Sequence, residues 1–461
     1  MSRHRSAFAF AFLFCAGASA VPAAGAPLRV GVFQAEVTPL VGSPLCNGAV
    51  KPVKQITTPL TARGVVLLGA GRPVVLCAFD WVGIANESHE VCRAELAAAV
   101  DTTPDRVAVH TLHQHDAPGS DFATERLLAA NGLGGLYSNA EFDREAIRRV
   151  AIAAKAAVAS ARPVTHLGFG AGVVERVASN RRIFDPATGQ VKLQRQSAGG
   201  RNPAAREAPE GTIDRLARLV AFWDGERPVA ALTYYATHPM SHYGQGAVNW
   251  DTVGYAREQR ERALPGVAHL HFNGAGGNVA AGKYNDGAPE RRPELAGRLA
   301  DGMRRAWETQ EKFAIDNAGA GWAVRPVVLP VRDTLVEAQL AARIKDTKLK
   351  QPDRLWAARD LVFLRRMHSG QAIPISCLQL GPARVLHLPG ELFVEYQLAA
   401  QAMRPGKFTA MAAYGDYGPG YIGTAVAYGQ GGYETGIVSR VAPAVEEVLT
   451  RTMRELLAQA P

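Results

Sequence analysis

Three histidines, His110, His113 and His115, lie in one short segment directly after the apolar run at residues 107–109. Side chains of an extended strand alternate between its faces, so the His-x-His pair of His113 and His115 would point both imidazoles the same way. Two imidazoles on one face can bind one metal ion. Pairs of this kind also occur as surface or hydrogen-bonded histidines, and the segment alone leaves both interpretations open.

Two further polar residues follow apolar runs elsewhere in the chain. His238 comes just after the run at residues 229–235, and Glu391 comes after the run at residues 383–388. Functional residues of α/β proteins gather at strand ends, where loops open onto a crevice. Glu391 would stand where a strand passes into a helix, and a carboxylate there also stabilises the first helical turn. Two histidines and a carboxylate are a ligand set that catalytic zinc uses, with one position open for water, so the pattern favours a metal-dependent hydrolase.

A tyrosine- and glycine-rich segment runs from Tyr414 through Tyr421 to Gly432, Tyr433 and Glu434. A phenol oxygen could supply a further metal ligand or a proton donor. The segment is also compatible with an ordered loop that is stabilised by aromatic packing. No Gly-x-Ser-x-Gly elbow is present, which disfavours a conventional serine hydrolase.

The elements that would position these residues alternate between β-rich apolar runs and helical patterns. We expect strands at residues 65–68, 74–79, 107–111, 216–222, 229–235, 267–272, 373–380 and 383–388, and helices at residues 86–99, 143–161, 289–309, 355–367 and 441–457. This mixture predicts an α/β fold in which a mixed sheet is flanked by helices. Residues 188–211 are rich in Gly, Gln, Arg and Pro, which predicts a long surface loop near the site.

The first 26 residues have the pattern of a secretory signal peptide. Arg3 and Arg5 precede a short apolar stretch that ends in small residues. That stretch is too short to span a bilayer. We therefore expect an exported protein, periplasmic or secreted, in which residues 1–26 are removed.

The charge of the chain constrains its partners. The formal net charge is +9, and removal of Arg3 and Arg5 would leave 9 − 2 = +7. The basic residues are scattered rather than clustered in a stripe, which disfavours nucleic-acid binding and favours no more than a weak peripheral attraction to anionic membrane surfaces. We expect a small-molecule or lipid substrate, and nothing in the sequence indicates a protein partner.

Four cysteines follow the expected signal: Cys46, Cys77, Cys92 and Cys377. None forms a Cys-x-x-Cys pair, which disfavours a thiolate zinc site. One disulfide could form in an oxidising compartment, but the sequence fixes no pairing. Cys77 lies in an apolar strand pattern and is expected in the core.

At these residues the sequence resembles the neutral/alkaline non-lysosomal ceramidase family. The matching segments occur in the same order along the chain, at residues 35–39, 59–64, 113–119, 180–181, 236–238, 251–256, 273–282, 389–391, 420–421 and 432–434. The match covers the N-terminal catalytic domain of that family. The resemblance therefore implies a ceramidase-like catalytic domain over residues 27–461.

The resemblance also implies a ligand set, a cofactor and an activity. The ligands of a Zn²⁺ ion would be His113, His238, Glu391 and Tyr421. His115 would act as an acid/base or hold the scissile carbonyl, while Arg181 and Tyr433 would stabilise the oxyanion. The implied reaction is hydrolysis of the amide bond of a ceramide-like N-acyl substrate by metal-activated water.

Three differences from the family pattern affect the substrate more than the metal. The glycine-rich hexapeptide of the family contains a serine, whereas residues 277–282 read Gly-Asn-Val-Ala-Ala-Gly, which excludes a serine mechanism there. We expect no C-terminal immunoglobulin-like domain after the helix at residues 441–457. Asp116 and Ala117 stand where the family prefers serine and glycine. A polar N-acyl or ester substrate at the same site, or an inactive exported binding protein, are the alternatives.

Overall fold

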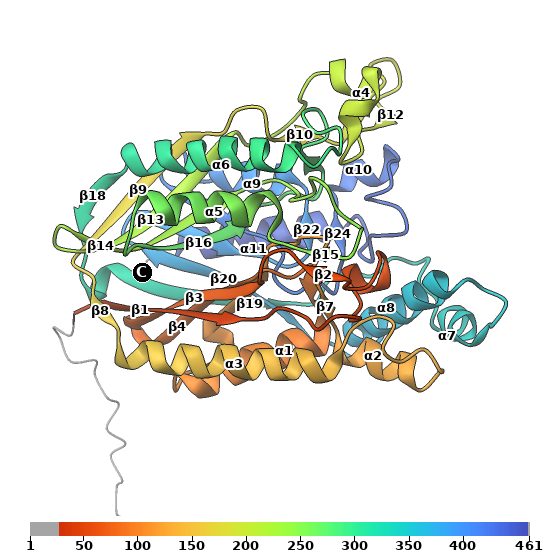
Figure 1. The fold of residues 1–461 in the computed structure, drawn as a ribbon, viewed down its shortest axis with the longest axis horizontal. Coiled ribbons are helices and arrows are strands. Elements are labelled where there is room, and N and C mark those ends of the chain that lie inside the picture. The colour runs from red at the N-terminus through yellow and green to blue at the C-terminus, as the bar shows by residue number, and fades with distance from the viewer. Residues whose placement is uncertain (1–26, 460–461) are drawn as a thin grey trace, which may run out of the picture.

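Two five-stranded sheets and one four-stranded sheet form the framework of the computed structural model, which describes residues 27–459 (Figure 1). The strand orders are β6-β4-β3-β1-β8, β16-β14-β13-β9-β18 and β19-β20-β21-β23. Each sheet combines antiparallel neighbours with one parallel pair, which is β4–β6, β14–β16 or β21–β23. The predicted α/β class with mixed sheets is confirmed, and there are several sheets where one was expected. The expected signal peptide at residues 1–26 lies outside the described residues.

The strand bounds follow the sheets. The first sheet contains β6 (Val107–Thr111), β4 (Gly71–Phe79), β3 (Thr61–Gly69), β1 (Arg29–Glu36) and β8 (Arg162–Pro163). The second contains β16 (Ala268–Asn273), β14 (Arg227–Tyr235), β13 (Leu216–Asp224), β9 (His166–Val173) and β18 (Glu311–Ala314). The third contains β19 (Ala320–Val327), β20 (Ile373–Leu380), β21 (Ala383–His387) and β23 (Thr409–Ala412). Short pairs are β10 (Ser179–Asn180) with β17 (Val279–Ala280), β11 (Arg182–Phe184) with β12 (Val191–Gln194), β2 (Gln55–Ile56) with β15 (Ala247–Val248), β22 (Glu391–Leu392) with β24 (Tyr421–Ile422), and β5 (Gly83–Ile84) with β7 (Gly119–Ser120).

Helices cover the outer faces of the sheets. Along the lower side of Figure 1, α1 (Asn86–Ala99) and α3 (Ala140–Ala159) pack on the first sheet, and along the upper side α5 (Asp251–Ala263) and α6 (Arg291–Glu308) pack on the second. The third sheet is covered by α9 (Val394–Ala402) and α11 (Val445–Ala458). The remaining helices are α2 (Phe122–Ala129), α4 (Pro203–Glu207), α7 (Glu337–Lys345), α8 (Gln351–His368) and α10 (Ala425–Gly429). Among the described residues, no helix has the length and apolar character needed to cross a membrane.

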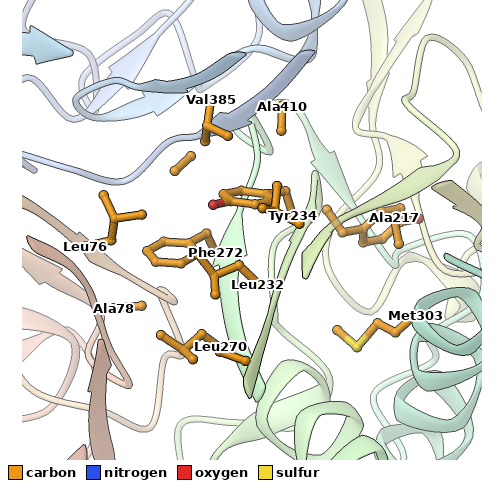
Figure 2. Close-up of a cluster of buried hydrophobic side chains, with 14 of the residues drawn as sticks. Leu76, Ala78, Ala217, Leu232, Tyr234, Leu270, Phe272, Met303, Val385 and Ala410 are labelled. Atoms are coloured by element: carbon orange, nitrogen blue, oxygen red, sulfur yellow. The ribbon is translucent and has the colours of Figure 1, made fainter. Parts of the chain in front are cut away.

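The three large sheets meet in one apolar interior (Figure 2). Leu76 reaches it from the first sheet, Tyr234 and Phe272 from the second, and Val385 and Ala410 from the third. The rings of Tyr234 and Phe272 stack with their centres 5.3 Å apart. Complete burial of such a side chain contributes about 1.5–3 kcal/mol. This shared core holds the ends of strands from all three sheets in fixed relative positions.

The structure corrects part of the predicted element list. The segment at residues 188–211 is not one long loop, because β12 pairs with β11 and the Asn202 side chain caps α4 by accepting from the N–H of Ala204 at 3.0 Å. Strands such as β1 and β9 were not predicted, whereas α9 is the helix that was expected after Glu391. All four cysteines of the described chain are free, so the disulfide that the sequence allowed is not formed, and Cys77 is buried in the core as expected.

Buried histidines make this interior sensitive to acid. His271 lies on β16, and burial together with nearby Arg257 lowers its pKa to about 3. The imidazole therefore stays neutral in the folded chain, whereas in the unfolded chain it takes up a proton below its ordinary pKa of about 6.5. The contribution of His271 to stability is complete above pH ~6.5 and is lost progressively as the pH falls from there toward 3.

Between pH ~7 and pH ~5 we expect the wild type to lose about 2 kcal/mol more of its free energy of unfolding than His271→Asn loses. The variant takes up one proton fewer on unfolding. Chemical unfolding curves at the two pH values measure the difference, and the comparison cancels the effect of pH on all other groups. Equal losses in the two proteins would show that His271 is not held neutral by the fold.

Candidate metal centre

The three residues first predicted to bind metal come from three different sheets. His113 follows β6, His238 follows β14, and Glu391 opens β22 shortly after β21. Figure 1 shows the short strands β2, β7, β15, β22 and β24 gathered at one end of the large sheets, where these residues lie. His113, His238 and Glu391 follow different strands and lie close together, as expected for polar residues at strand ends.

A turn, rather than strand alternation, directs His113 into the site. The strand β6 ends at Thr111, and His113 has a φ of 63°, in the left-handed region that residues other than glycine seldom occupy. Its N–H donates to the carbonyl of Trp81 at 2.8 Å, which fixes the turn. The predicted extended His-x-His geometry is therefore wrong. His113 and His115 are nevertheless neighbours, with ring centres 4.9 Å apart.

One donor atom from each of His113, His238 and Glu391 lies within 4.8 Å of the other two, and all three residues are buried. Glu391 Oε2 is 3.2 Å from His113 Nε2 and 2.9 Å from His238 Nε2. Zinc holds nitrogen and carboxylate ligands at ~2.0–2.2 Å. Donors with these separations can therefore share one ion.

The other nitrogen of each imidazole is occupied by a backbone carbonyl. His113 Nδ1 lies 2.6 Å from the oxygen of Val82, and His238 Nδ1 lies 2.5 Å from the oxygen of Gly276. A carbonyl only accepts, so each Nδ1 carries a hydrogen and each ring presents its Nε2 to Glu391. In the metal-binding form of the rings, two Nε2 lone pairs and a carboxylate oxygen would converge on one cation. Hydrogen bonds of this kind also orient histidines that bind metals, so these residues fit a divalent metal ion.

The charges of the site suit metal binding at neutral pH. Burial lowers the pKa of His238 to about 4, and the Arg181 guanidinium acts in the same direction. Burial alone would raise the pKa of Glu391, but the His113 and His238 imidazoles outweigh it and hold that pKa well below its ordinary value. Tyr417 donates to Glu391 Oε1 at 2.8 Å, which leaves Oε2 directed at the histidines. A neutral imidazole and an ionised carboxylate are the states that bind a metal.

Backbone pairing places Tyr421 beside Glu391. The two residues are opposite one another in the parallel pair β22–β24. Tyr421 Oη lies 3.1 Å from His238 Nε2 and accepts from Arg181 Nη1 at 3.2 Å. Burial raises the pKa of Tyr421 well above its ordinary value, so the phenol keeps its proton at neutral pH. The Tyr421 hydroxyl is thus within reach of an ion held by the two histidines and the glutamate.

Arg181 and Tyr433 extend this group of hydroxyl and guanidinium donors. Tyr433 Oη lies 2.9 Å from Tyr421 Oη, and the Arg181 guanidinium lies 4.9 Å from the centre of the Tyr433 ring. The next residue, Glu434, is buried and forms an ion pair with Arg182 at 3.7 Å. This ion pair anchors the segment that carries Tyr433.

His115 stands beside the three-donor group without being part of it. Its Nδ1 lies 3.1 Å from the carbonyl oxygen of His113, so Nδ1 carries the hydrogen and Nε2 keeps a free lone pair. Burial, assisted by His113 and His238, holds the pKa of His115 well below its ordinary value. The neutral ring can accept a proton at Nε2.

The predicted site residues border one cavity of about 370 Å³. The cavity is lined by His113, His115, Arg181, Glu391, Tyr421 and Tyr433. His238 is not among the lining residues, and its Nε2 lies 3.1 Å from Tyr421 Oη. Gln196 and Ser197 also line the cavity, so the segment at residues 188–211 lies near the site as predicted. The volume is within the range of ~300–1,000 Å³ found for small-molecule sites.

Sequence reasoning left several residues of this site without a role. The tyrosine-rich segment was singled out, yet only Tyr421 and Tyr433 were assigned, although Tyr417 holds Glu391 and the ring centre of Tyr414 lies 4.8 Å from that of His113. The density of tyrosines was the available signal. Arg359 and Cys46 also line the cavity, and no motif around them indicated this.

The hexapeptide turn supports a ligand instead of offering a nucleophile. Ala280 is buried and its backbone pairs with Ser179 and bridges to His238. The N–H of His238 donates to the carbonyl of Val279 at 2.9 Å. Residues 277–282 therefore help to hold His238 in place.

Comparisons with known proteins identify the fold. A scan against protein-family models and a search of curated proteins found no match. Among solved structures, the chain is similar to one described as "Ceramidase complexed with C2", with 18% identity and a TM-score of 0.67 over 94% of this chain and 77% of that chain. It is also similar to the neutral ceramidase from Pseudomonas aeruginosa, with 17% identity and a TM-score of 0.66 over 94% of this chain and 76% of that chain. The chain has a neutral ceramidase-like fold.

Proposed function

We propose that the chain is a zinc-dependent hydrolase that cleaves the amide bond of a ceramide-like N-acyl compound. The observation that carries the proposal is the convergence of two imidazole Nε2 atoms, from His113 and His238, on the buried Glu391 carboxylate. Two histidines, one glutamate and an adjacent phenol, Tyr421, form a donor set that suits zinc. Zinc bound there would supply a Lewis acid and lower the pKa of a water to ~7. The neutral ceramidase-like fold supports an amide as the bond cleaved.

The remaining residues of the cavity would handle protons and charge. We assign His115 to take the proton of the attacking water at its free Nε2 and to deliver it to the leaving nitrogen. Arg181 and Tyr433 would donate hydrogen bonds where negative charge develops on the carbonyl oxygen. Tyr421 accepts from Arg181 and contacts Tyr433, so it keeps both donors in position beside His238.

Polar side chains on part of the cavity wall support a second candidate, in which the same reaction acts on a more polar substrate. Arg181, Gln196, Ser197 and Arg359 line the space next to Glu391. The second candidate is therefore the same metal chemistry on a polar N-acyl or ester compound. An inactive binding protein would not need three metal donors, a neutral base and buried oxyanion donors in one place. The site of action that we propose, periplasmic or extracellular, rests on the sequence of residues 1–26.

We expect dialysis of the purified protein against a chelator to abolish hydrolysis of short-chain ceramide and of simple N-acyl amides, and zinc to restore it. The metal provides the electrophile, whose loss removes several kcal/mol of transition-state stabilisation. Release of fatty acid, followed by chromatography before and after zinc addition, measures this effect. Mock dialysis without chelator is the control. Turnover that persists in metal-free protein would refute the metal mechanism, and zinc-loaded protein that cleaves no N-acyl compound would favour the binding protein.

A further inference from the structure

The cavity wall holds a second buried guanidinium that the proposed reaction does not use. Arg359 lies on α8, three residues after Trp356, so both side chains lie on one face of the helix and line the cavity. The residue is 9% exposed. Its guanidinium is surrounded by aromatic rings, with ring centres at 4.6 Å for Trp356, 5.6 Å for Tyr417 and 5.7 Å for Tyr137.

Most buried arginines of the described chain are satisfied by carboxylates or backbone carbonyls. Arg257 binds Asp80 at 2.9 Å and Arg440 binds Asp360 at 2.8 Å. Arg195 donates to several backbone carbonyls, including that of Ala205 at 2.9 Å. These arginines have structural partners, which is the usual condition for burying a guanidinium.

Arg359 has no such partner within residues 27–459. It forms no salt bridge there, because the neighbouring carboxylate of Asp360 is engaged by Arg440. The aromatic rings attract its charge and the Tyr417 hydroxyl can accept one hydrogen bond, but no carboxylate or backbone carbonyl of the described residues satisfies its other N–H donors. Arg260 on α5 also lacks a salt bridge within the same residues, but it does not line the cavity. Arg359 combines an unpaired charge with a place on the cavity wall.

The charges around the cavity attract an anion. Among the residues that line it, Glu391 is the one carboxylate and is held by the histidines, whereas Arg181 and Arg359 both lack a salt bridge in the described chain. Arg181 belongs to the group around Tyr421. Arg359 packs against Tyr417, whose hydroxyl bonds Glu391, whereas Arg181 contacts Tyr421 and Tyr433, so the two guanidiniums are held by different tyrosines of the cavity wall.

We infer that Arg359 binds a carboxylate of the substrate, so that the site takes an N-acyl compound with an acidic head group, such as an N-acyl amino acid, in preference to neutral ceramide. The inference rests on the proposed function of the metal centre. The planar fork of a guanidinium matches a carboxylate through two parallel hydrogen bonds, and such charge-assisted pairs are strong when they are shielded from water. Trp356, Tyr137 and Tyr417 hold the fork in place, and of these three residues only the Tyr417 hydroxyl engages one of its donors.

The test compares N-octanoylglycine with N-octanoylglycinamide, which share the scissile amide and differ in the carboxylate. We expect the wild type to prefer the acid by roughly 10- to 100-fold in kcat/KM. In Arg359→Gln, kcat/KM for N-octanoylglycine should fall while kcat/KM for N-octanoylglycinamide stays unchanged, so the preference is lost. Arg359→Lys should keep part of the preference because the charge remains. Arg343→Gln, which removes an exposed charge on α7, is the matched control and should behave like the wild type.

Melting temperature and metal content of each variant separate binding from folding. Equal rates for the two compounds in the wild type, or an equal loss for both compounds in Arg359→Gln, would overturn the inference and leave the proposed hydrolase intact. If neither compound is cleaved but short-chain ceramide is, the inference is overturned; if none of the three is cleaved, the proposed function fails. Calorimetric titration of N-octanoylglycine into wild type and Arg359→Gln then decides the role of Arg359, since binding that is equal in the two, or absent from both, contradicts it.

Discussion

Replacing His238 with alanine is expected to remove the bound metal and to lower the hydrolytic rate by roughly 1,000-fold or more. His238 supplies one of the two imidazole nitrogens of the site and lies 2.9 Å from Glu391 Oε2. With one imidazole gone, His113 and Glu391 alone cannot complete a three-donor set. Metal content by mass spectrometry and turnover on the same preparation measure both consequences.

The matched control for this variant is His242→Ala. His242 lies four residues further along the chain and contacts the carbonyl of Gly287 at 3.0 Å, outside the metal centre. The control loses an imidazole from the same segment and should keep both its metal and its rate. Full metal occupancy in folded His238→Ala would show that this histidine is not a ligand.

Replacing Tyr433 with phenylalanine is expected to slow hydrolysis on the order of 100-fold while metal content and melting temperature stay unchanged. The substitution removes the hydroxyl that contacts Tyr421 Oη at 2.9 Å but keeps the ring beside Arg181. Loss of one hydrogen-bond donor to the developing oxyanion raises the free energy of the transition state more than that of the bound substrate. The effect should therefore fall on kcat more than on KM, and steady-state kinetics with metal analysis can separate the two.

Tyr428→Phe controls for the loss of a phenol hydroxyl in the same part of the chain. Tyr428 contacts Ser439 Oγ at 3.0 Å and does not line the cavity. Its variant should lose little activity. Equal rates for Tyr433→Phe and the wild type would remove Tyr433 from the proposed chemistry, whatever the result for His238.

The candidate site could be anticipated from the sequence because its donors follow strands. His113, His238 and Glu391 each come shortly after an apolar run, and strand ends converge where sheets share a core. Tyr421, Arg181 and Tyr433 had weaker local signals and were carried by the ceramidase resemblance. The structure places them next to the three donors, while their chemical roles stay predictions.

What the sequence could not supply depends on contacts between distant segments. The left-handed turn at His113 is fixed by the hydrogen bond that its N–H donates to the carbonyl of Trp81, just after the end of a different strand, and no local pattern encodes this contact. Tyr417 reaches the cavity from a loop, and Arg359 reaches it from the helix α8. The local sequence around each residue does not indicate that its side chain borders a cavity. The helix α4 forms because Asn202 caps it, although a segment rich in Gly, Gln, Arg and Pro predicts a loop.

The most direct test of the metal centre is anomalous X-ray scattering at the zinc absorption edge from crystals of the purified protein. One strong peak is expected, ~2.0–2.2 Å from His113 Nε2, His238 Nε2 and a carboxylate oxygen of Glu391. The peak should be absent from crystals of His238→Ala. A zinc-supplemented crystal with no peak among these three side chains, or with its peak elsewhere in the chain, would contradict the account.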